Sequence, residues 1–385
     1  MKQVMIVGAG RLGKGFFGET FNNAGWKIAF LDKDPRVVEE LKRTGSYHVE
    51  VHRVDSIENR TVSGYEAYVC DENYSCMDAF LNTDVIMLPL YPKDFREAGH
   101  YLSKCLIEFY KKQPEKKLTA ICVTNKNYLI PEIIESFKEK LPDDVKAWFD
   151  TNVAVRDSII RRGTDAQTHY ATEIVTMAVA SLLIQTPVYN DFSDVEWLEL
   201  NDQIETLKDL KVFAINGPHA STAFWGYLKG YATIPDSEKD EEIAQIIGQV
   251  HQEILNMIER EYDITKEELD NLENLPTPMG EIPDSIYRVA FDPIRKLSSG
   301  DRLTGAAERC LKHGLSYEAI AKGMAAGFGY AEPKDENAVK LQEEIKVLGI
   351  EATVHKYTRL EKDSPILRKV VEEYEALKAR GLIKE

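Results

Sequence analysis

The stretch Val4-Met5-Ile6-Val7-Gly8-Ala9-Gly10-Arg11-Leu12-Gly13 lies at the start of the chain and predicts how the first half folds. Four apolar residues that stop at a glycine are typical of a buried parallel strand. The glycines follow the pattern G-x-G-x-x-G, and a helix-like stretch runs from Lys14 to Ala24. In such a turn the glycines permit the sharp bend, the approach of a pyrophosphate and close helix packing. We therefore predict a Rossmann-type, doubly wound α/β sheet.

An acidic residue indicates which dinucleotide binds there. A second apolar strand, Ile28 to Leu31, ends at Asp32, about 20 residues beyond the glycines. A carboxylate at this place accepts hydrogen bonds from the ribose hydroxyls of NAD and repels the 2′-phosphate of NADP. Lys33 weakens that preference slightly, and a turn-capping role for Asp32 is the alternative. We predict NAD as cofactor, bound by Gly8, Ala9, Gly10, Arg11, Leu12, Gly13 and Asp32.

Further apolar runs are expected to extend the sheet. They cover residues 84–90, 118–123 and 175–184, with a connecting strand in 150–162 and extra strands or a hairpin in 46–69. Ligands bind beyond the carboxyl ends of parallel strands. Asn125, just after the second of these runs, is therefore predicted to meet a substrate oxygen, and an ordinary Asx turn is the alternative.

Helical periodicity replaces the strands after about residue 190. The expected helices cover residues 221–229, 240–260, 266–275, 302–313, 317–328, 336–348 and 365–379. A chain of 385 residues also exceeds one ordinary hydrophobic core. We predict a Rossmann domain over residues 1–190 and a mostly α-helical substrate and catalytic domain over residues 191–385.

Composition excludes several classes of protein. A net charge of −16 argues against a nucleic-acid partner and requires that an anionic substrate be held by a local basic cluster. The chain has no apolar run of 18 residues and no recognisable signal peptide, so we expect a cytoplasmic protein without a membrane partner. The 5 cysteines form no disulfide or zinc pattern, and no histidine pair has metal-ligand spacing on a helix. Metal-free chemistry is the expectation.

The stretch Lys211 to Ala220 carries the candidate catalytic groups. It combines an amine, a carboxamide and an imidazole in Lys211, Asn216 and His219. Oxidation of an alcohol needs a base for the hydroxyl proton and neutral donors for the developing alkoxide. On an α-helix the last two are i,i+3 neighbours, with the lysine within an arc of roughly 140°. A surface lysine, a capping asparagine and a buried histidine are the alternative.

A second polar segment, Asp292 to Ser298, interrupts the helices of the second half. With Asp301 and Arg302 it forms either a salt-bridge network or a clamp for a substrate phosphate. Arginine has the fork geometry that suits phosphate. The candidate phosphate ligands are Arg295, Lys296 and Arg302.

These residues resemble a known family. Lys211, Asn216 and His219 match the K-x4-N-x2-H signature of the polyol-specific long-chain dehydrogenases, also called the mannitol dehydrogenase family. The opening Gly8 to Gly18 and the segment Arg288 to Leu303 are similar to its mannitol-1-phosphate 5-dehydrogenase branch. The resemblance covers nearly the whole chain.

The resemblance implies metal-independent hydride transfer between NAD and a hexitol phosphate, most simply mannitol 1-phosphate giving fructose 6-phosphate. Lys211 would be the general acid and base, Asn216 and Asn125 would polarise the carbonyl oxygen, and His219 would hold a substrate hydroxyl or orient the lysine. Departures from the family pattern at Thr124, at Arg156-Asp157 and at Pro218 fall near the expected substrate. An unphosphorylated hexitol or a hexuronate is the alternative substrate, and a non-catalytic NAD-binding protein is a third possibility. A monomer or a homodimer is expected.

Overall fold

The computed structural model describes residues 2–280 and 283–383. The chain divides into two compact units, and each is described by itself. The first comprises Met1–Lys208 with Leu275–Glu281, and the second comprises Asp209–Asn274 with Ile282–Glu385. The domain division at residues 190 and 191 stays a prediction.

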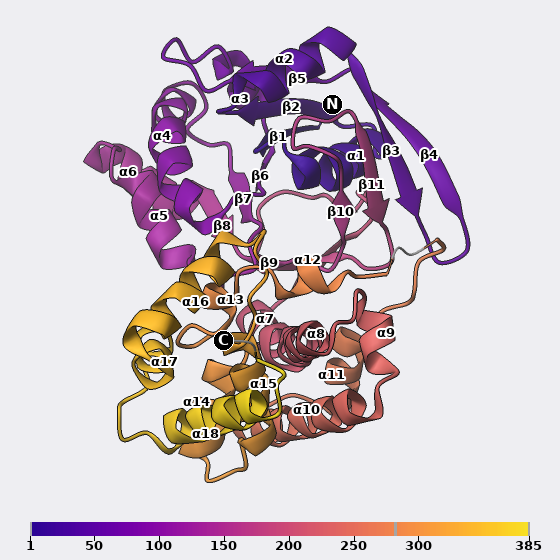
Figure 1. Cartoon of the computed structure of the whole chain (residues 1–385). Helices are drawn as coiled ribbons and strands as arrows, with labels where there is room; N and C mark the ends of the chain where they lie inside the picture. Colours follow the sequence, from indigo (N-terminus) through magenta and orange to yellow (C-terminus); the bar gives the residue numbers. More distant parts are fainter. Residues whose placement is uncertain (1, 281–282, 384–385) are drawn as a thin grey trace. The chain divides into compact units, whose positions relative to one another are not determined.

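A six-stranded parallel sheet forms the centre of the first unit, with the strand order β5-β2-β1-β6-β7-β8 (Figure 1). Alternate residues of β1 enter two separate cores. Val4 and Ile6 pack in the core that contains Phe16, while Met5 belongs to the core that contains Phe109. Apolar side chains on both faces explain why the strand is an uninterrupted hydrophobic run. The Rossmann-type prediction is confirmed. The strands are β1 (Gln3–Val7), β2 (Lys27–Asp32), β5 (Glu66–Val69), β6 (Val85–Leu88), β7 (Leu118–Cys122) and β8 (Val153–Arg156).

Helices flank this sheet, and the one after the glycine turn is unusual. It begins as a π-helix, η1 (Gly13–Gly18), and continues as α1 (Glu19–Asn23). A methyl group at Gly18 would overlap the Tyr47 hydroxyl, so the helix lies very close to its neighbours. The other helical segments are α2 (Pro35–Thr44), α3 (Met77–Asn82), η2 (Pro92–Asp94), α4 (Phe95–Lys112), α5 (Ile130–Lys138) and α6 (Asp143–Asn152).

Two smaller sheets complete the strands of this unit. The hairpin expected in 46–69 is present as β3 (Ser46–His52) and β4 (Ile57–Ser63), within a sheet of order β10-β11-β3-β4. The expectation that 175–184 continues the main sheet is wrong. That region holds β11 (Glu173–Met177), which pairs with β3, and β12 (Leu182–Gln185), which pairs with β9 and β13. Apolar periodicity indicates burial but does not specify the pairing partner. The remaining strands are β9 (Ser158–Ile159), β10 (Thr164–Asp165) and β13 (Leu198–Asn201).

The chain returns to the first unit near residue 279. The Met279 N–H donates to the Arg53 carbonyl at 2.7 Å, and the Met279 carbonyl lies 2.6 Å from His52 Nδ1. Gly280 has φ of 68°, and a methyl group on it would lie 3.3 Å from the His52 ring. These contacts fasten the returning segment to the β3–β4 hairpin.

The second unit is helical, and α8 (Asn216–Lys229) packs against α10, α12 and α15. All seven helices predicted for this half are present as α8, α10, α11, α14, α15, α16 and α18. The unit also contains helices that were not predicted, among them α12 and α17. The boundary between the units, after Lys208, falls within α7 (Ile204–Leu210). The bounds in the second unit are η3 (Lys211–Ile215), α9 (Ile234–Glu238), α10 (Glu241–Glu261), α11 (Lys266–Glu273), α12 (Ile286–Ala290), α13 (Pro293–Lys296), α14 (Thr304–Lys312), α15 (Glu318–Phe328), α16 (Glu336–Leu348), α17 (Ile350–Thr358) and α18 (Pro365–Ala379).

A buried carboxylate joins two of these helices. Glu253 on α10 accepts hydrogen bonds from the Ala319 and Ile320 backbone N–H groups, both at 3.0 Å, and from the Ser316 hydroxyl at 2.5 Å. It therefore satisfies the first N–H groups of α15, which lack a partner within their own helix. In the ranges 2–280 and 283–383, no helix has the length and apolarity needed to cross a membrane.

Candidate active site

Lys211 and Asn216 are aligned by a π-helical turn. Residues Lys211–Ile215 form the π-helix η3, and the Asn216 N–H donates to the Lys211 carbonyl. This i to i+5 hydrogen bond places Asn216 about one turn after Lys211, on the same side. The turn is π-helical and not α-helical, and it places the pair within the arc of roughly 140° that an α-helix would give. The wider turn places the backbone positions of the two residues closer in direction around the helix axis than an α-helix would.

His219 follows Asn216 by three residues on α8, so these two share one helix face as predicted. Its Nε2 lies 3.4 Å from Asp284 Oδ2, and Asp284 is also ion-paired with Arg288 of α12. The imidazole keeps 35% of its side chain exposed. One ring nitrogen of His219 thus lies close to a carboxylate oxygen, while part of the ring remains exposed to solvent.

The electrostatic surroundings keep His219 neutral. Burial, followed by the positive charges of Arg288, Arg302 and Lys296, lowers its pKa to about 4. The negative charge of Asp284 would raise the pKa of His219, but the ion pair with Arg288 offsets much of the Asp284 charge. Because the ring is uncharged near pH 7, it can donate or accept a hydrogen bond without adding a positive charge.

Lys296 is a buried amine. Its Nζ donates to the Val289 carbonyl at 2.6 Å and also to the Phe291 carbonyl. Burial, then the charges of Arg302 and Arg295, lowers its pKa to about 7. Two backbone carbonyls already hold this amine, so among the predicted phosphate ligands it is the most constrained.

The two arginines of the basic segment have carboxylate partners in their own loop. Arg302 donates from Nε to Asp301 at 2.8 Å, and Arg295 donates from Nε to Asp292 at 3.2 Å. The Arg302 carbonyl lies 3.2 Å from the position that a methyl group at Gly217 would occupy. Arg302 therefore lies beside the start of α8, next to Asn216. The salt-bridge reading of this segment is seen directly, and a role with phosphate stays a prediction.

The dinucleotide turn has the expected geometry in the first unit. Gly8 has φ of 104°, which favours glycine, and a methyl group at Gly13 would overlap the Gly8 carbonyl oxygen. Asp32 accepts from the Ala9 N–H at 2.7 Å and from the Asp34 N–H at 2.9 Å. The acid at the end of β2 thus lies against the turn.

The backbone at Gly10 is open. A methyl group there would meet no atom within 4 Å, in contrast to the crowded Gly13. The turn therefore leaves space at the residue where a pyrophosphate has to approach the backbone. Arg11 and Leu12 follow at the start of the helix, and a dinucleotide fits this set of residues.

Asn125 is exposed in the loop beyond β7, at the carboxyl edge of the main sheet. In the same loop, the Thr124 hydroxyl oxygen accepts from the Lys126 N–H at 3.3 Å. Asn125 belongs to the first unit, whereas Lys211, Asn216, His219 and the basic segment belong to the second.

One buried ion pair near this edge was not predicted. Lys208 Nζ donates to Asp157 Oδ1 at 2.6 Å, and both side chains are almost completely buried. Asp157 also accepts from the Ser158 N–H, and the Ser158 hydroxyl donates to the Cys122 carbonyl. Asp284 was missed as well. It lies 65 positions after His219, and no spacing rule links the two.

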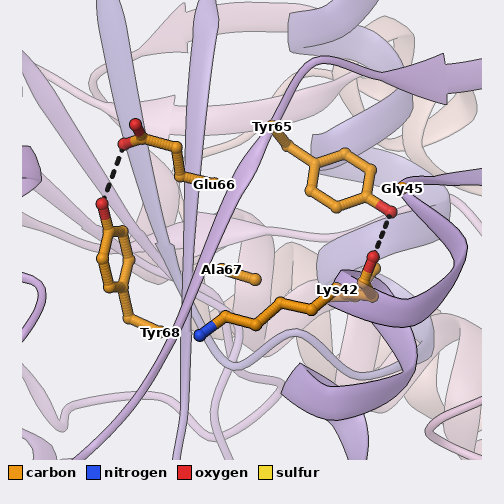
Figure 2. Close-up of a pocket in the computed structure, with 7 residues that line it drawn as sticks. Lys42, Gly45, Tyr65, Glu66, Ala67 and Tyr68 are labelled. Carbon is orange, nitrogen blue, oxygen red and sulfur yellow. Dashed lines mark hydrogen bonds between the residues drawn. The ribbon is translucent and has the colours of Figure 1, made fainter.

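A cavity of about 360 Å³ lies between α2 and β5, where the Tyr65 hydroxyl donates to the Leu41 carbonyl (Figure 2). None of its lining residues is a predicted site residue, so it is separate from the candidate site. Within the described ranges, no group of three His, Cys, Asp or Glu side chains is arranged to hold a metal ion.

A parallel sheet with a dinucleotide turn, continued by a helical half that carries the Lys-Asn-His stretch, defines a nucleotide-dependent dehydrogenase. The Mannitol dehydrogenase Rossmann domain matches residues 2–185, and the Mannitol dehydrogenase C-terminal domain matches residues 203–378. The chain belongs to the mannitol dehydrogenase family, and the resemblance seen in the sequence is confirmed.

Curated relatives match along the full length. A mannitol-1-phosphate 5-dehydrogenase of Caldanaerobacter subterraneus is 28% identical, over 99% of this chain and 100% of the relative. One of Thermoanaerobacter pseudethanolicus is 27% identical, over 98% of both chains. Among solved structures, Pseudomonas fluorescens mannitol 2-dehydrogenase, in a ternary complex with NAD and D-mannitol, superposes with a TM-score of 0.72 at 12% identity. That match covers 99% of this chain and 92% of the other and supports the fold.

Proposed function

We propose that this enzyme interconverts mannitol 1-phosphate and fructose 6-phosphate with NAD as the hydride carrier. The observation that carries the proposal is the π-turn that aligns Lys211 with Asn216, with His219 on the same face of α8. The full-length relatives named mannitol-1-phosphate 5-dehydrogenase support the substrate. Chemistry on an unphosphorylated hexitol or a hexuronate is not favoured by these relatives.

Each polar group in the stretch from Lys211 to Ala220 has its own role in the oxidation of the alcohol. When bound, NAD accepts the hydride that leaves the carbinol carbon. Lys211 takes the hydroxyl proton, so that the carbon–oxygen bond becomes a carbonyl. Asn216 donates a hydrogen bond to the oxygen as negative charge develops on it, and the similar role that the family resemblance implies for Asn125 stays a prediction. In the reducing direction the same lysine returns the proton.

His219 and Asp284 fix the position of the substrate in this scheme. A neutral imidazole held by Asp284 presents its other nitrogen to a sugar hydroxyl. Arg288 compensates the charge of Asp284, so the carboxylate orients the ring without making it cationic. Asp284 is therefore proposed as a positioning residue.

A basic cluster supports the phosphorylated substrate. Arg302 lies beside the start of α8, and Arg295 keeps 54% of its side chain exposed. Guanidinium groups in this place suit a sugar phosphate in a chain whose net charge is −16. We propose Arg295 and Arg302 as phosphate ligands, with Lys296 as support for their loop.

A substrate panel tests the assignment. NADH oxidation is measured with fructose 6-phosphate, fructose and tagaturonate at equal concentrations. We expect fructose 6-phosphate to give a kcat/KM at least about 100-fold above the others, because a charged anchor group is worth a few kcal/mol. A comparable rate with fructose or tagaturonate would replace the phosphorylated sugar by the alternative substrate. Dialysis against a chelator is expected to leave the rate unchanged, since the proposed chemistry uses no metal.

The role of Lys211 is tested separately from cofactor binding. Lys211→Ala should lower kcat by about three orders of magnitude or more, because it removes the proposed acceptor of the hydroxyl proton. NADH affinity, followed by fluorescence, should stay within twofold of the parent. Lys266→Ala, at an exposed lysine in the first turn of α11, is the control. Unchanged turnover in Lys211→Ala would remove the lysine from the mechanism.

We also propose a cytoplasmic enzyme that acts as a monomer or homodimer. The small, anionic and diffusible substrate agrees with that location. Light scattering of the purified chain against its mass of 43.7 kDa decides the oligomeric state.

A further inference from the structure

A strap from a distant part of the sequence runs beside the dinucleotide turn. It consists of residues 165–171, which are the end of β10 and the loop that leads to β11. Its first residue, Asp165, is 3.4 Å from Arg11 of the glycine turn. Lys14, in the helix that follows the turn, donates from Nζ to the His169 carbonyl at 3.1 Å and to the Ala171 carbonyl at 2.7 Å.

The far part of the strap reaches the end of β2. His169 Nε2 lies 2.7 Å from Asp34 Oδ2, two residues after the predicted ribose acid Asp32. The ring of Tyr170 lies 5.5 Å from the Arg36 guanidinium and packs edge-on against His169 at 5.3 Å. The strap therefore follows the turn from the glycines to the start of α2.

Lys14 anchors the backbone of the strap, while the aromatic side chains of the strap stay partly exposed. The Lys14 amine is buried, and burial lowers its pKa to about 8. Its hydrogen bonds go to two carbonyls of the strap. His169 keeps 50% of its side chain exposed, and Tyr170 remains 37% exposed. A rigid backbone with exposed aromatic side chains is a suitable surface for a flat ring.

We propose that the strap forms one wall of the adenosine half of the dinucleotide site, with Tyr170 and His169 contacting the adenine and its ribose. The wall lies on the side of Asp32 and Asp34, where the adenosine ribose is expected, and the backbone at Gly10 stays open. Tyr170 offers an aromatic face for the purine, and His169 offers a hydrogen bond to a ribose hydroxyl. This proposal rests on the proposed use of NAD.

The test separates the two halves of the cofactor. Dissociation constants of the full-length protein are measured by calorimetry for NADH, ADP-ribose and reduced nicotinamide mononucleotide. Tyr170→Ala should weaken NADH and ADP-ribose by about tenfold, because stacking on one aromatic ring is worth on the order of 1–3 kcal/mol. His169→Ala should weaken both by a smaller factor. The mononucleotide should bind each variant as it binds the parent.

Matched controls exist in the same unit. Tyr189 has the same exposed fraction of 37% and also lies against a cation, Lys117. His48 is an exposed histidine bonded to Thr61. Tyr189→Ala and His48→Ala should leave ADP-ribose binding unchanged.

Four outcomes decide between these possibilities. Unchanged ADP-ribose affinity in Tyr170→Ala, or equal weakening of the mononucleotide, overturns the strap as an adenosine wall. Recovery of the affinity in Tyr170→Phe supports stacking, even if the alanine variant is less stable. If the parent protein itself binds no NADH, the proposed function fails first, and that result is distinct from a loss confined to the variants.

Discussion

The pKa of His219 has a consequence for stability that can be measured. In the folded protein burial and three cations lower it to about 4, whereas an unfolded histidine titrates near pH 6.5. Between these values the unfolded state binds a proton that the folded state does not, so stability falls as the pH drops from about 6.5 toward 4. Above pH 6.5 the residue makes no pH-dependent contribution.

His219→Gln should therefore reduce the loss of stability between pH 7 and pH 5. The difference in Tm between the two pH values is compared with that of the parent and of His48→Gln. We expect a smaller difference for His219→Gln alone, by a few degrees at most because the side chain is 35% exposed. Equal differences in all three proteins would contradict a neutral, cation-surrounded imidazole.

Asp284 is the residue for which sequence and structure differ most. The Lys211, Asn216 and His219 signature is local, so its resemblance to the family pattern could be recognised in the sequence. The Asp284 contact depends on how the chain folds back between α8 and α12, which no short-range pattern encodes. Asp284→Asn should raise KM for the sugar more than it lowers kcat, since it removes the orienting charge but not the base. Steady-state kinetics with Asp202→Asn, an exposed aspartate, as control measure this split.

At the scale of elements, two glycines of one turn should respond oppositely to the same change. The methyl group of Gly10→Ala meets no protein atom, so this variant should fold with a Tm close to that of the parent. Its NADH affinity should fall by about 100-fold or more, because the methyl group occupies the place of the pyrophosphate. Gly13→Ala would overlap the Gly8 carbonyl and should lower the Tm itself. Thermal unfolding and NADH titration of both variants check this contrast. A large loss of Tm in Gly10→Ala would mean that the space there is not free.

The Glu253 cap of α15 gives a second prediction at this scale. Glu253→Ala leaves two buried N–H groups without a partner and should lower the free energy of unfolding by about 1–3 kcal/mol. Glu259→Ala, on the exposed face of the same helix α10, should change it by less than about 0.5 kcal/mol. Urea unfolding of the three proteins measures both values. Equal effects would show that the cap does not contribute.

Helix positions were largely predictable, but helix type was not. The periodic apolar stripe of α10 identified that helix almost to the residue. The π-helical turns η1 and η3 differ from α-helix by one extra residue in a turn, and the sequence has no spacing that reveals it. The alignment of Lys211 with Asn216 depends on that difference. This part of the site is therefore visible only in the structure.

On the scale of the whole molecule, the Rossmann-type main sheet followed from the glycine turn and the apolar runs, whereas its strand order was seen only in the structure. The sheets to which the strands after residue 156 belong could not be predicted. They are apolar enough to be buried, yet β11 and β12 pair in two separate small sheets. The local sequence indicates how deeply a strand is buried, whereas tertiary packing determines which strand it pairs with. The fold class was correct for this reason, and the sheet membership of 175–184 was not.

The path of the chain has a further consequence. It leaves the first unit after Lys208, returns for Leu275–Glu281 through the Met279 and Gly280 contacts, and leaves again. A ribosome must therefore synthesise more than 70% of the polypeptide before the nucleotide-binding half has all its residues, since the last of the described contacts is made by residue 280 of 385. A protease that cuts only the first crossing divides the polypeptide into residues 1–208 and 209–385, and noncovalent contacts such as those of Met279 still hold the returning segment to the first piece. Such a nick would stay invisible on a native gel and appear only after denaturation.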